Sequence, residues 1–365
     1  MEAGEGGAAG PLLSVIIPTL NEAIALPLLL GDLGRQEGIA LEIIVGDGGS
    51  SDGTEAAARE AGVRFVTGPR GRGAQMNAAA GEARGDYLFF LHADSRLADP
   101  HLLATAVAAL RAAEPEQPWT AGHFRLHFLR SDRRHDLAYR FLEAKTELNR
   151  PGTTNGDQGL LLSRRFFGLL GGFDHSLPFL EDQRMAATIR NRGRFCTLPG
   201  VLATSARRFE SEGFHRRYLL MGMMMAMFTV GEWAFFHRAP TVYRVQEATG
   251  RLLLAPIFAL LWSMALKDWG LRGTLRRFYR LGRYLRENAW QVFLFVDVWR
   301  GRDAGNEALP LLGLYDRMIA RWLRLPVIDA LAGLLGFGWY MLVLSGFFWL
   351  QEWLAPQVRC WRGER

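Results

Sequence analysis

The sequence predicts an α/β fold, in which a mostly parallel sheet carries helices on both faces, followed by a helical C-terminal region. Three observations lead to this prediction. Short apolar runs alternate with longer mixed stretches along the first part of the chain, which is the pattern of βαβ units. The run Tyr87–Leu91 is apolar throughout, as in a strand buried on both faces. A hydrophobic content of 49% over 365 residues supports a sizeable core.

Four strands and three helices are expected before residue 95. The strands are short runs rich in Leu, Ile, Val and Phe, and the helices are the mixed stretches between them. The expected strands are Leu13–Ile17, Leu41–Val45, Val63–Val66 and Tyr87–Leu91, and the expected helices are Asn21–Arg35, Asp52–Ala61 and Gly73–Arg84. Because ligands bind at the carboxyl ends of strands in open α/β sheets, the polar and glycine residues after these strands are expected to form one site.

The residues after the second and third strands fit a nucleoside diphosphate. Asp47 offers acceptors for a base or ribose, and the glycines beside it let the backbone approach a ligand closely. Arg70 or Arg72 would neutralise phosphate charge. Neither the Gly-x-x-x-x-Gly-Lys-[Ser/Thr] phosphate loop nor Gly-x-Gly-x-x-Gly after the first strand is present, which disfavours ATPases and dinucleotide dehydrogenases.

His92 and Asp94 follow the fourth strand and form a candidate metal site. An imidazole and a carboxylate can hold a divalent cation, and such a cation neutralises the charge that develops on a diphosphate leaving group. The alternative is a strand end with two solvated polar side chains. The pair therefore indicates Mn²⁺ or Mg²⁺ as cofactor without excluding the simpler interpretation.

A second group of polar residues begins at residue 155 and suggests an acceptor side and a catalytic base. Asp157 and Gln158 precede an apolar run and either line the acceptor side or form a turn that enters a strand. Glu181 and Asp182 begin a helical stretch, and Asp182 is the preferred base for taking a proton from an acceptor oxygen. A helix N-terminus would hold that carboxylate as an anion and lower its basicity, and a simple helix cap is the alternative. His215 either closes over the diphosphate or belongs to a solvated basic surface.

Five motifs in this order resemble family 2 glycosyltransferases of the GT-A fold, over roughly residues 12–235. They are Pro18-x-x-Asn-Glu22, Asp47-Gly-Gly-Ser-Ser-Asp-Gly-Thr54, Gly71-Arg-Gly-Ala-Gln-Met-Asn77, His92-Ala-Asp94, and Gly171-Gly-Phe-Asp174 followed by Glu181-Asp182. The resemblance implies a nucleotide-sugar donor, a divalent metal and inversion at the anomeric carbon. By position it implies that Glu22 and Asp47 hold the nucleoside, that Asp94 binds the metal and that Asp182 is the base.

The full donor site expected from these motifs comprises Pro18, Asn21, Glu22, Asp47, Arg70, Arg72, Gln75 and Asn77. His92 departs from the family pattern, which usually has Asp at this position. Because imidazole suits Mn²⁺ and similar ions better than Mg²⁺, this departure changes the expected metal preference.

The positive charge of the protein is concentrated in its second part. Residues 1–236 carry 25 basic and 27 acidic residues, net −2, whereas residues 237–365 carry 18 and 10, net +8. A basic region that is also rich in Trp, Phe and Leu favours an anionic membrane surface, and no nucleic-acid-binding signature accompanies the charge. Residues 1–11 are expected to be flexible, and they lack the features of a signal peptide. We therefore expect a membrane protein whose catalytic domain, residues 12–235, lies on the cytoplasmic side.

The C-terminal region, residues 236–365, contains two candidate membrane segments. In Gly270–Asn288 arginines alternate with Leu, Phe and Tyr, as in a basic helix on a membrane surface, although a solvated helix packed on the protein is the alternative. Ala330–Leu350 has 21 residues without a charge and is long enough to cross a membrane, or to enter and return at Gly336 and Gly338. Leu252–Leu266 covers only about 22 Å and is too short to cross.

Taken together, these patterns predict transfer of a sugar from a nucleotide-sugar to a lipid-linked or other membrane-presented acceptor, in the manner of polyprenyl-phosphate glycosyltransferases. The expected reaction is a metal-assisted inverting displacement. Three alternatives stay open: a nucleotide-sugar-binding membrane protein without turnover, a glycosyltransferase with a soluble acceptor, and a nucleotidyltransferase. The last lacks an N-terminal glycine-rich signature followed by Arg and Lys.

Overall fold

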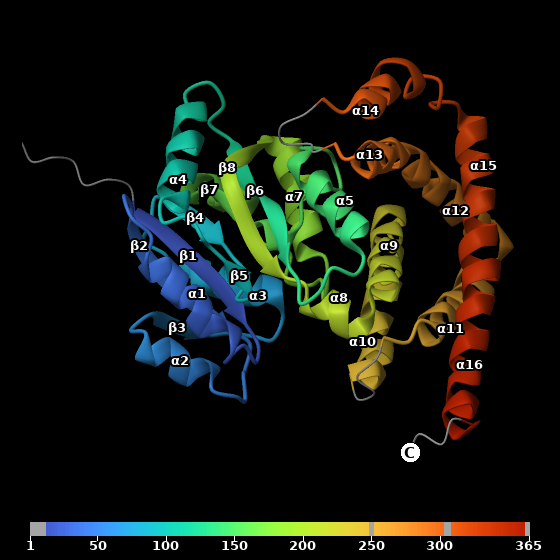
Figure 1. Cartoon of the computed structure of the whole chain (residues 1–365), viewed down its shortest axis with the longest axis horizontal. Helices are drawn as coiled ribbons and strands as arrows, with labels where there is room; N and C mark the ends of the chain where they lie inside the picture. The colour runs from blue at the N-terminus through green and yellow to red at the C-terminus, as the bar shows by residue number, and fades with distance from the viewer. Residues whose placement is uncertain (1–11, 248–251, 303–307, 362–365) are drawn as a thin grey trace, which may run out of the picture. The chain divides into compact units, whose positions relative to one another are not determined.

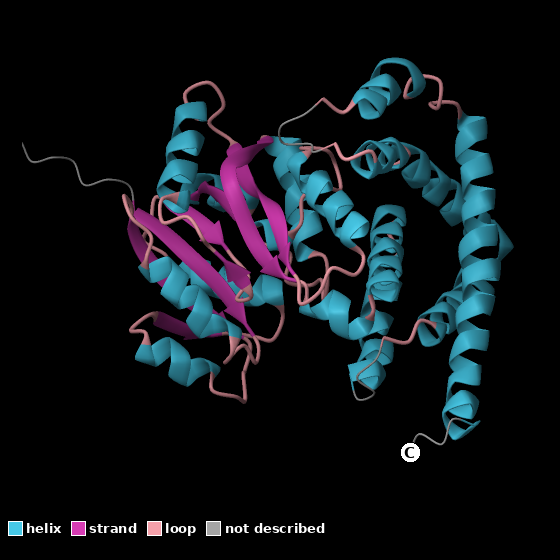
Figure 2. Cartoon of the chain, in the orientation of Figure 1, coloured by secondary structure: helices cyan, strands magenta, loops and turns pink. Residues whose placement is uncertain are grey.

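The structure, a computed structural model, describes residues 12–247, 252–302 and 308–361. The expected flexible segment 1–11 therefore lies outside the described residues. The chain divides into two compact units, Met1–Ser205 and Ala206–Arg365. All described strands belong to the first unit and the second is helical, as Figure 2 shows. The expected boundary after residue 235 lies inside the second unit, within helix α10 (Trp233–Glu247).

The first unit is built on a sheet of eight strands in the order β3-β2-β1-β4-β7-β6-β8-β5 (Figure 1). Pairs β3–β2, β2–β1, β1–β4 and β6–β8 are parallel, whereas β7 is antiparallel to both neighbours and β5 is antiparallel to β8. The predicted α/β fold with a mostly parallel sheet is thus confirmed. The strands are β1 (Leu12–Thr19), β2 (Ala40–Asp47), β3 (Arg64–Thr67), β4 (Tyr87–Phe90), β5 (Ser95–Arg96), β6 (Thr120–Leu129), β7 (Leu160–Ser163) and β8 (Arg194–Ser205).

Seven α-helices and one short 3-10 helix accompany this sheet. They are α1 (Ala25–Gly34), α2 (Thr54–Glu60), α3 (Arg72–Gly81), α4 (Leu102–Ala113), α5 (Asp136–Glu147), the 3-10 helix η1 (Gly156–Gln158), α6 (Arg164–Leu170) and α7 (Glu181–Arg192). All elements expected before residue 95 are present. The largest difference is at α1, which begins four residues later than predicted because Asn21 has a left-handed backbone, φ 58°, and bonds to the loop after β2.

Strand β4 lies in the middle of the sheet, and the chain continues from it to His92 and Asp94. All four of its residues are buried, and Phe90 packs against Phe173 and Phe167 with ring centroids 4.9 and 5.0 Å away. Neighbouring residues of β1 alternate between two buried faces, since Ile16 belongs to one core cluster and the fully buried Ile17 points the opposite way. Both faces of the sheet are therefore covered, as the continuous apolar run of β4 predicts.

The second unit consists of helical elements, three of which are π-helices. They are α8 (Arg207–Glu212), α9 (Phe214–Val230), α10 (Trp233–Glu247), α11 (Ala255–Ser263), η2 (Met264–Trp269), α12 (Gly270–Glu287), α13 (Trp290–Trp299), α14 (Pro310–Leu314), η3 (Tyr315–Ile319), α15 (Pro326–Phe337), η4 (Gly338–Leu344) and α16 (Ser345–Trp361), where η2, η3 and η4 are π-helical. The predicted basic helix is α12.

Elements α15, η4 and α16 follow one another without a break. Gly338 has helical backbone angles, φ −55° and ψ −46°, so the chain does not turn back at Gly336 or Gly338 and the expectation of a return there is wrong. The segment Pro326–Leu354 of this continuous helix has 29 residues, and the mean hydropathy of its most apolar window is 1.8. Among the described residues it is the one helix that is long and apolar enough to cross a membrane.

Candidate active site

The loop after β2 is folded around the buried carboxylate of Asp47. Its oxygens accept hydrogen bonds from Thr19 Oγ1 (2.8 Å), Gly49 N (2.8 Å), and Ser50 N and Oγ (2.7 and 2.5 Å). Burial alone would raise the pKa of Asp47, but these four hydrogen bonds outweigh it and hold the pKa below its ordinary value. Because a carboxylate has about four acceptor positions, Asp47 here organises the loop rather than presenting a free acceptor.

The loop after β1 is joined to the same structure. The Asn21 N–H donates to Ser50 Oγ (2.8 Å), and Asn21 Oδ1 accepts from the Ser51 N–H (2.9 Å). Glu22 is partly buried and its N–H donates to a threonine hydroxyl of α2, while Pro18 is buried in β1. These contacts bring the predicted donor residues of the two strand ends together at the carboxyl edge, as expected from the parallel pairing of β1 and β2.

Two predicted donor residues of α3 support the backbone of this edge. Gln75 is buried and donates its side-chain N–H to the carbonyl of Thr19. Asn77 binds Phe173 twice, accepting from its N–H (2.9 Å) and donating to its carbonyl (2.8 Å). Both side chains are thereby used in holding loops in place. Arg70, in contrast, is exposed.

Arg72, at the start of α3, lies near three carboxylates, those of Glu181, Asp182 and Asp157. Its Nη1 lies 3.2 Å from Oε1 of Glu181, a residue that is only 2% exposed. Burial alone would lower the pKa of Arg72, but the carboxylates of Glu181, Asp182 and Asp157 raise it. Arg72 was predicted to bind the diphosphate, and its pairing with Glu181 was not predicted, since no sequence pattern links residues 109 positions apart.

The turn that contains η1 is a rigid part of the site. Asn155 and Gln158 form a capping box, in which Asn155 Oδ1 accepts from the Asp157 N–H (3.1 Å) and Gln158 Oε1 accepts from the Asn155 N–H (2.9 Å). Gln158 is fully buried, so it anchors the turn in the core. Its Nε2 donates to the carbonyls of Phe124 and Thr146 (both 3.1 Å) and lies 2.9 Å from Nδ1 of His123. Gly156 and Asp157 are left to form the rim of the turn.

Asp182, the predicted base, is held by two backbone amides. Its Oδ2 accepts from the Gly156 N–H and its Oδ1 from the Gln183 N–H, both at 2.7 Å. Burial, together with the neighbouring carboxylate of Glu181, raises the pKa of Asp182. This is opposite to the expectation that the helix N-terminus would lower its basicity, because loss of hydration outweighs the favourable hydrogen bonds. A carboxyl group with a raised pKa at a defined position is suited to proton transfer.

His92 faces this turn. Its Nδ1 lies 2.8 Å from Oδ1 of Asp157, and a Cβ placed on Gly156 would lie 2.8 Å from its Nε2. Both ring nitrogens are thus directed at residues 156 and 157. The turn therefore contacts both His92 and Asp182.

The surroundings of His92 and Asp94 show which of these two side chains suits a divalent cation. The residues that the structure describes contain no group of three His, Cys, Asp or Glu side chains that would hold a metal by themselves. Asp94 is partly buried just after β4, and a single carboxylate suits a cation that takes its other ligands from substrate phosphates and water. Asp94 fits such a cation, whereas the imidazole of His92 is engaged through Nδ1 by Asp157.

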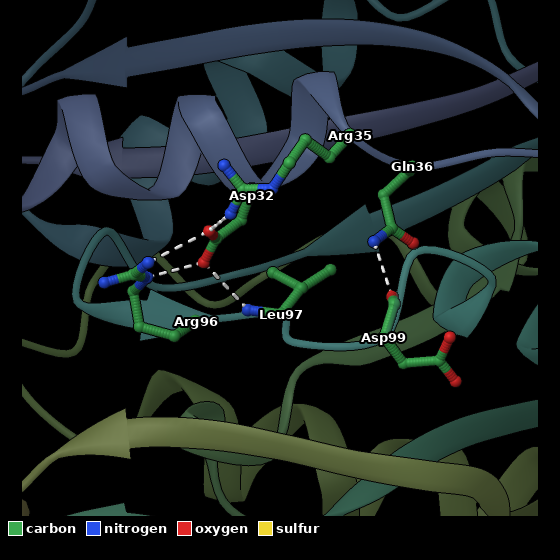
Figure 3. A network of polar contacts seen from close by, with 6 residues as sticks. All are labelled: Asp32, Arg35, Gln36, Arg96, Leu97 and Asp99. Carbon is green, nitrogen blue, oxygen red and sulfur yellow. Dashed lines mark hydrogen bonds and ion pairs between the residues drawn. The ribbon is translucent and has the colours of Figure 1, made fainter.

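The segment that follows Asp94 is fixed by a buried carboxylate on α1, as Figure 3 shows. Asp32 accepts from Nε and Nη2 of Arg96 (2.5 and 3.0 Å) and from the Leu97 N–H (3.0 Å). Burial alone would raise the pKa of Asp32, but these bonds and the charges of Arg96 and Arg35 lower it. This contact was not predicted from the sequence. It holds β5 and so limits the movement of Asp94.

His215 is the one predicted site residue of the second unit. It is exposed at the start of α9, with its ring 5.8 Å from that of Phe214. The other predicted site residues all belong to the first unit.

Comparisons with known proteins give a match to one family and to several solved structures. Residues 14–167 match the glycosyl transferase family 2 model. No curated protein matches the sequence. The mannosyltransferase PcManGT of Pyrobaculum calidifontis, solved with GDP-Man and Mn²⁺, is 20% identical with a TM-score of 0.45, over 90% of this chain and 87% of that one. Residues 1–349 of S. aureus TarS with UDP-GlcNAc are 17% identical with a TM-score of 0.45, over 88% and 89%. Glucosyl-3-phosphoglycerate synthase of Mycobacterium tuberculosis, solved with Mn²⁺ and UDP, is 21% identical with a TM-score of 0.37, over 56% and 77%.

Proposed function

Because residues 14–167 match the glycosyl transferase family 2 model, we propose that this protein transfers a sugar from a nucleoside diphosphate sugar to a membrane-presented acceptor, with inversion at the anomeric carbon. The observation that carries this proposal is the environment of the Asp182 carboxyl group. Its carboxyl group has a raised pKa, is fixed by the amides of Gly156 and Gln183, and lies within a cluster of charged groups. Such a group is suited to removing a proton from an acceptor hydroxyl.

The chemistry assigned to Asp182 is one proton transfer. Each of its oxygens accepts one backbone hydrogen bond and keeps a lone pair for the hydroxyl proton of the acceptor. As the acceptor oxygen forms its bond to the anomeric carbon, the bond from that carbon to the diphosphate oxygen breaks and the nucleoside diphosphate leaves with the electron pair. Attack from the face opposite the leaving group inverts the configuration. Glu181 stays ion-paired with Arg72 and is not needed as a second base.

The donor side is assigned to the loops at the carboxyl ends of β1, β2 and β4. The exposed Arg70 would balance part of the diphosphate charge, while Arg72 stays paired with Glu181. Asp94 would hold a divalent cation, Mn²⁺ or Mg²⁺, and the bound cation would neutralise charge on the leaving diphosphate. With His92 directed at Asp157, the metal preference is set by Asp94 and the phosphates, which are oxygen ligands.

The membrane-presented acceptor is supported by the second unit. Residues 237–365 have a net charge of +8, and large apolar side chains are exposed on several helices of the unit. A surface that combines positive charge with exposed Leu and Trp suits an anionic membrane. A soluble acceptor is the second candidate function, favoured if the exposed apolar surface is covered by protein instead.

The test is product analysis with the full-length protein. We would incubate it with a panel of nucleotide-sugars, Mn²⁺ or Mg²⁺, and either extracted membrane lipids or a lipid-free acceptor mixture. The expected result is a glycosylated lipid formed by the wild type and absent with Asp182→Asn. Glycosylation in the lipid-free mixture alone would replace the membrane acceptor with a soluble one. Nucleotide-sugar binding without any product or hydrolysis would indicate a binding protein and contradict the proposal.

A further inference from the structure

We propose that the helix Pro326–Leu354 lies in the plane of the membrane on one side of the bilayer and does not cross it. The proposal deepens the membrane part of the proposed function and rests on it. It assigns an anionic lipid bilayer to one surface, here called the lipid-facing stripe. The stripe consists of the exposed apolar residues Leu331, Leu334, Leu335, Trp339, Leu342, Val343, Phe347, Leu350 and Trp353.

The lipid-facing stripe covers one side of the helix over almost its whole length. Its members recur three to four residues apart, which places them on one face. Leu335 near the start is 73% exposed and Phe347 near the end is 54% exposed. The opposite face is buried within the second unit by residues such as Met341, Leu344 and Phe348. One face is therefore packed on protein, and the other presents apolar side chains to the surroundings.

Both ends of the helix are tied to other helices of the unit. At the start, Asp329 accepts from Arg286 Nε of α12 at 2.5 Å, with both side chains largely buried. At the end, Glu352 pairs with Arg216 of α9 at 2.5 Å and accepts from the Leu254 N–H at 2.9 Å. These contacts mean that the helix enters or approaches a membrane together with its neighbours and not alone.

Helix α12 is the neighbour that decides the orientation. Its backbone touches that of α15, because a Cβ on Gly282 would lie 1.9 Å from the Asp329 carbonyl oxygen and one on Gly333 would lie 2.3 Å from that of Phe278. Phe278 also packs on Phe337 with ring centroids 4.8 Å apart. The two helices therefore run antiparallel and stay together for about 12 Å, eight residues at 1.5 Å each.

That packing is incompatible with a crossing. If Pro326–Leu354 crossed the bilayer, α12 would run beside it from Asp329 toward the centre, with the exposed Arg272, Arg276 and Arg283 in hydrocarbon. Exposed arginines there are strongly unfavourable. In the plane of the membrane the same arginines reach lipid phosphates, while Leu271 (77% exposed) and Leu275 enter the acyl region. A second copy of the chain is a poorer occupant, because it would bring a second set of arginines against the first.

The test maps both ends and the centre of the helix with single cysteines in full-length protein. In a background with Cys196→Ser and Cys360→Ser, two exposed polar positions outside the lipid-facing stripe, Arg324→Cys just before the helix and Gln351→Cys near its end, are treated with a membrane-impermeant maleimide in inverted membrane vesicles. An in-plane helix predicts labelling of both without detergent. If one end reacts only after detergent, the helix crosses and the proposal is overturned. Glu60→Cys, on the exposed surface of the catalytic unit, is the control for vesicle orientation.

A second measurement reports the depth of the helix centre. An environment-sensitive fluorophore on Leu342→Cys is quenched by lipids with nitroxides at shallow or deep acyl positions. Stronger quenching by the shallow label supports the in-plane helix, and stronger quenching by the deep label contradicts it. Release of the protein from vesicles by a high-salt wash would remove both this proposal and the membrane acceptor. Retention with ends on opposite sides would overturn this proposal alone.

Discussion

At the scale of single residues, the site is defined by how Asp182 is surrounded. A carboxylate at a helix N-terminus with two amide donors would ordinarily be a weak base. Here burial and the adjacent Glu181 carboxylate reverse that tendency and raise the pKa of Asp182. Glu181 is in turn neutralised by Arg72, so one carboxylate of the pair is committed to an ion pair and the other is available for proton transfer.

Replacing Asp182 by Asn is expected to lower the transfer rate at least about 100-fold, because the amide cannot accept the acceptor proton. Affinity for the nucleotide should change little. The measurement is the initial rate of transfer beside calorimetric titration of the nucleoside diphosphate. Asp132→Asn, which changes an exposed carboxylate outside the five motifs, is the matched control and should retain activity. Equal losses of binding and rate in Asp182→Asn would assign the residue to a structural cap.

The raised pKa of Asp182 also predicts how activity depends on pH. The residue must be ionised to take a proton, so the transfer rate should fall as the pH drops through its pKa. Because that pKa lies above the ordinary Asp value of 3.8, the acid limb of the profile should lie at higher pH than for an unperturbed aspartate. Transfer rates at saturating substrate across the acid range measure the limb. A limb at or below the ordinary value would contradict the assignment.

His92 and Asp94 are predicted to behave differently, although only one residue separates them. Asp94→Asn should abolish metal-dependent binding of the nucleoside diphosphate, measured by titration with and without Mn²⁺ or Mg²⁺. His92→Asp should leave that binding in place but lower the rate, because it sets a second carboxylate against Asp157. His92→Asn keeps an N–H donor at this position and should retain most activity. Loss of metal-dependent binding in His92→Asn would restore the imidazole as a metal ligand.

At the scale of elements, the turn at residues 155–158 contacts His92, which follows β4, and Asp182 on α7. Its capping box and the buried Gln158 make it rigid, so the Gly156 amide is a fixed support for the proposed base. The close approach of His92 leaves no room for a side chain at Gly156.

Gly156→Ala tests that support. A Cβ there would lie 2.8 Å from His92 Nε2, so the imidazole must move away from the turn, while its distance of 3.5 Å from Asp182 Oδ2 is an ordinary contact beside the proposed base. We expect a lower transfer rate with little change in nucleotide affinity. Gly81→Ala, at the end of α3 where a Cβ meets nothing within 4 Å, is the control and should leave both unchanged. Normal activity in Gly156→Ala would show that the turn is not needed to place the base.

At the scale of the whole molecule, the protein combines an α/β catalytic unit with a helical unit that exposes both arginines and large apolar side chains. The two features predict different responses to salt. Arginine contacts with anionic lipid are screened as salt rises, whereas burial of apolar side chains in the bilayer is not weakened in this way.

Full-length protein is therefore expected to stay in the membrane pellet through a high-salt wash. At low salt, Arg272→Ser with Arg276→Ser should lower binding to anionic vesicles about 30-fold, from about 1 kcal/mol for each arginine near the surface. Vesicle sedimentation at increasing salt measures both effects. Nucleotide binding should be unchanged in the double variant, because the predicted donor residues all precede residue 95. Complete release of wild-type protein by salt would show that the exposed apolar residues do not enter the bilayer.

The sequence by itself determined the order and type of the elements in the catalytic unit, because strands and helices leave local patterns. The run Tyr87–Leu91 predicts a buried strand wherever it lies in the fold, and the polar residues after it mark the strand end. Asp94 and Asp182 were located in the same way, from their positions at element boundaries. The basic helix α12 was also visible, as arginines alternating with apolar residues.

Only the tertiary structure decided which side chains meet and what those meetings do. Arg72 pairs with Glu181 across 109 positions and His92 with Asp157 across 65, and contacts between such distant residues produce no periodicity in a sequence. The raised pKa of Asp182 depends on burial by residues from several elements, so its direction was not predictable from the helix start alone. The uncharged run 330–350 would have the same sequence pattern whether it crossed a membrane or lay along it. The contact between α12 and α15 supports the proposal that the segment lies along the membrane, because it places the arginines of α12 beside that run.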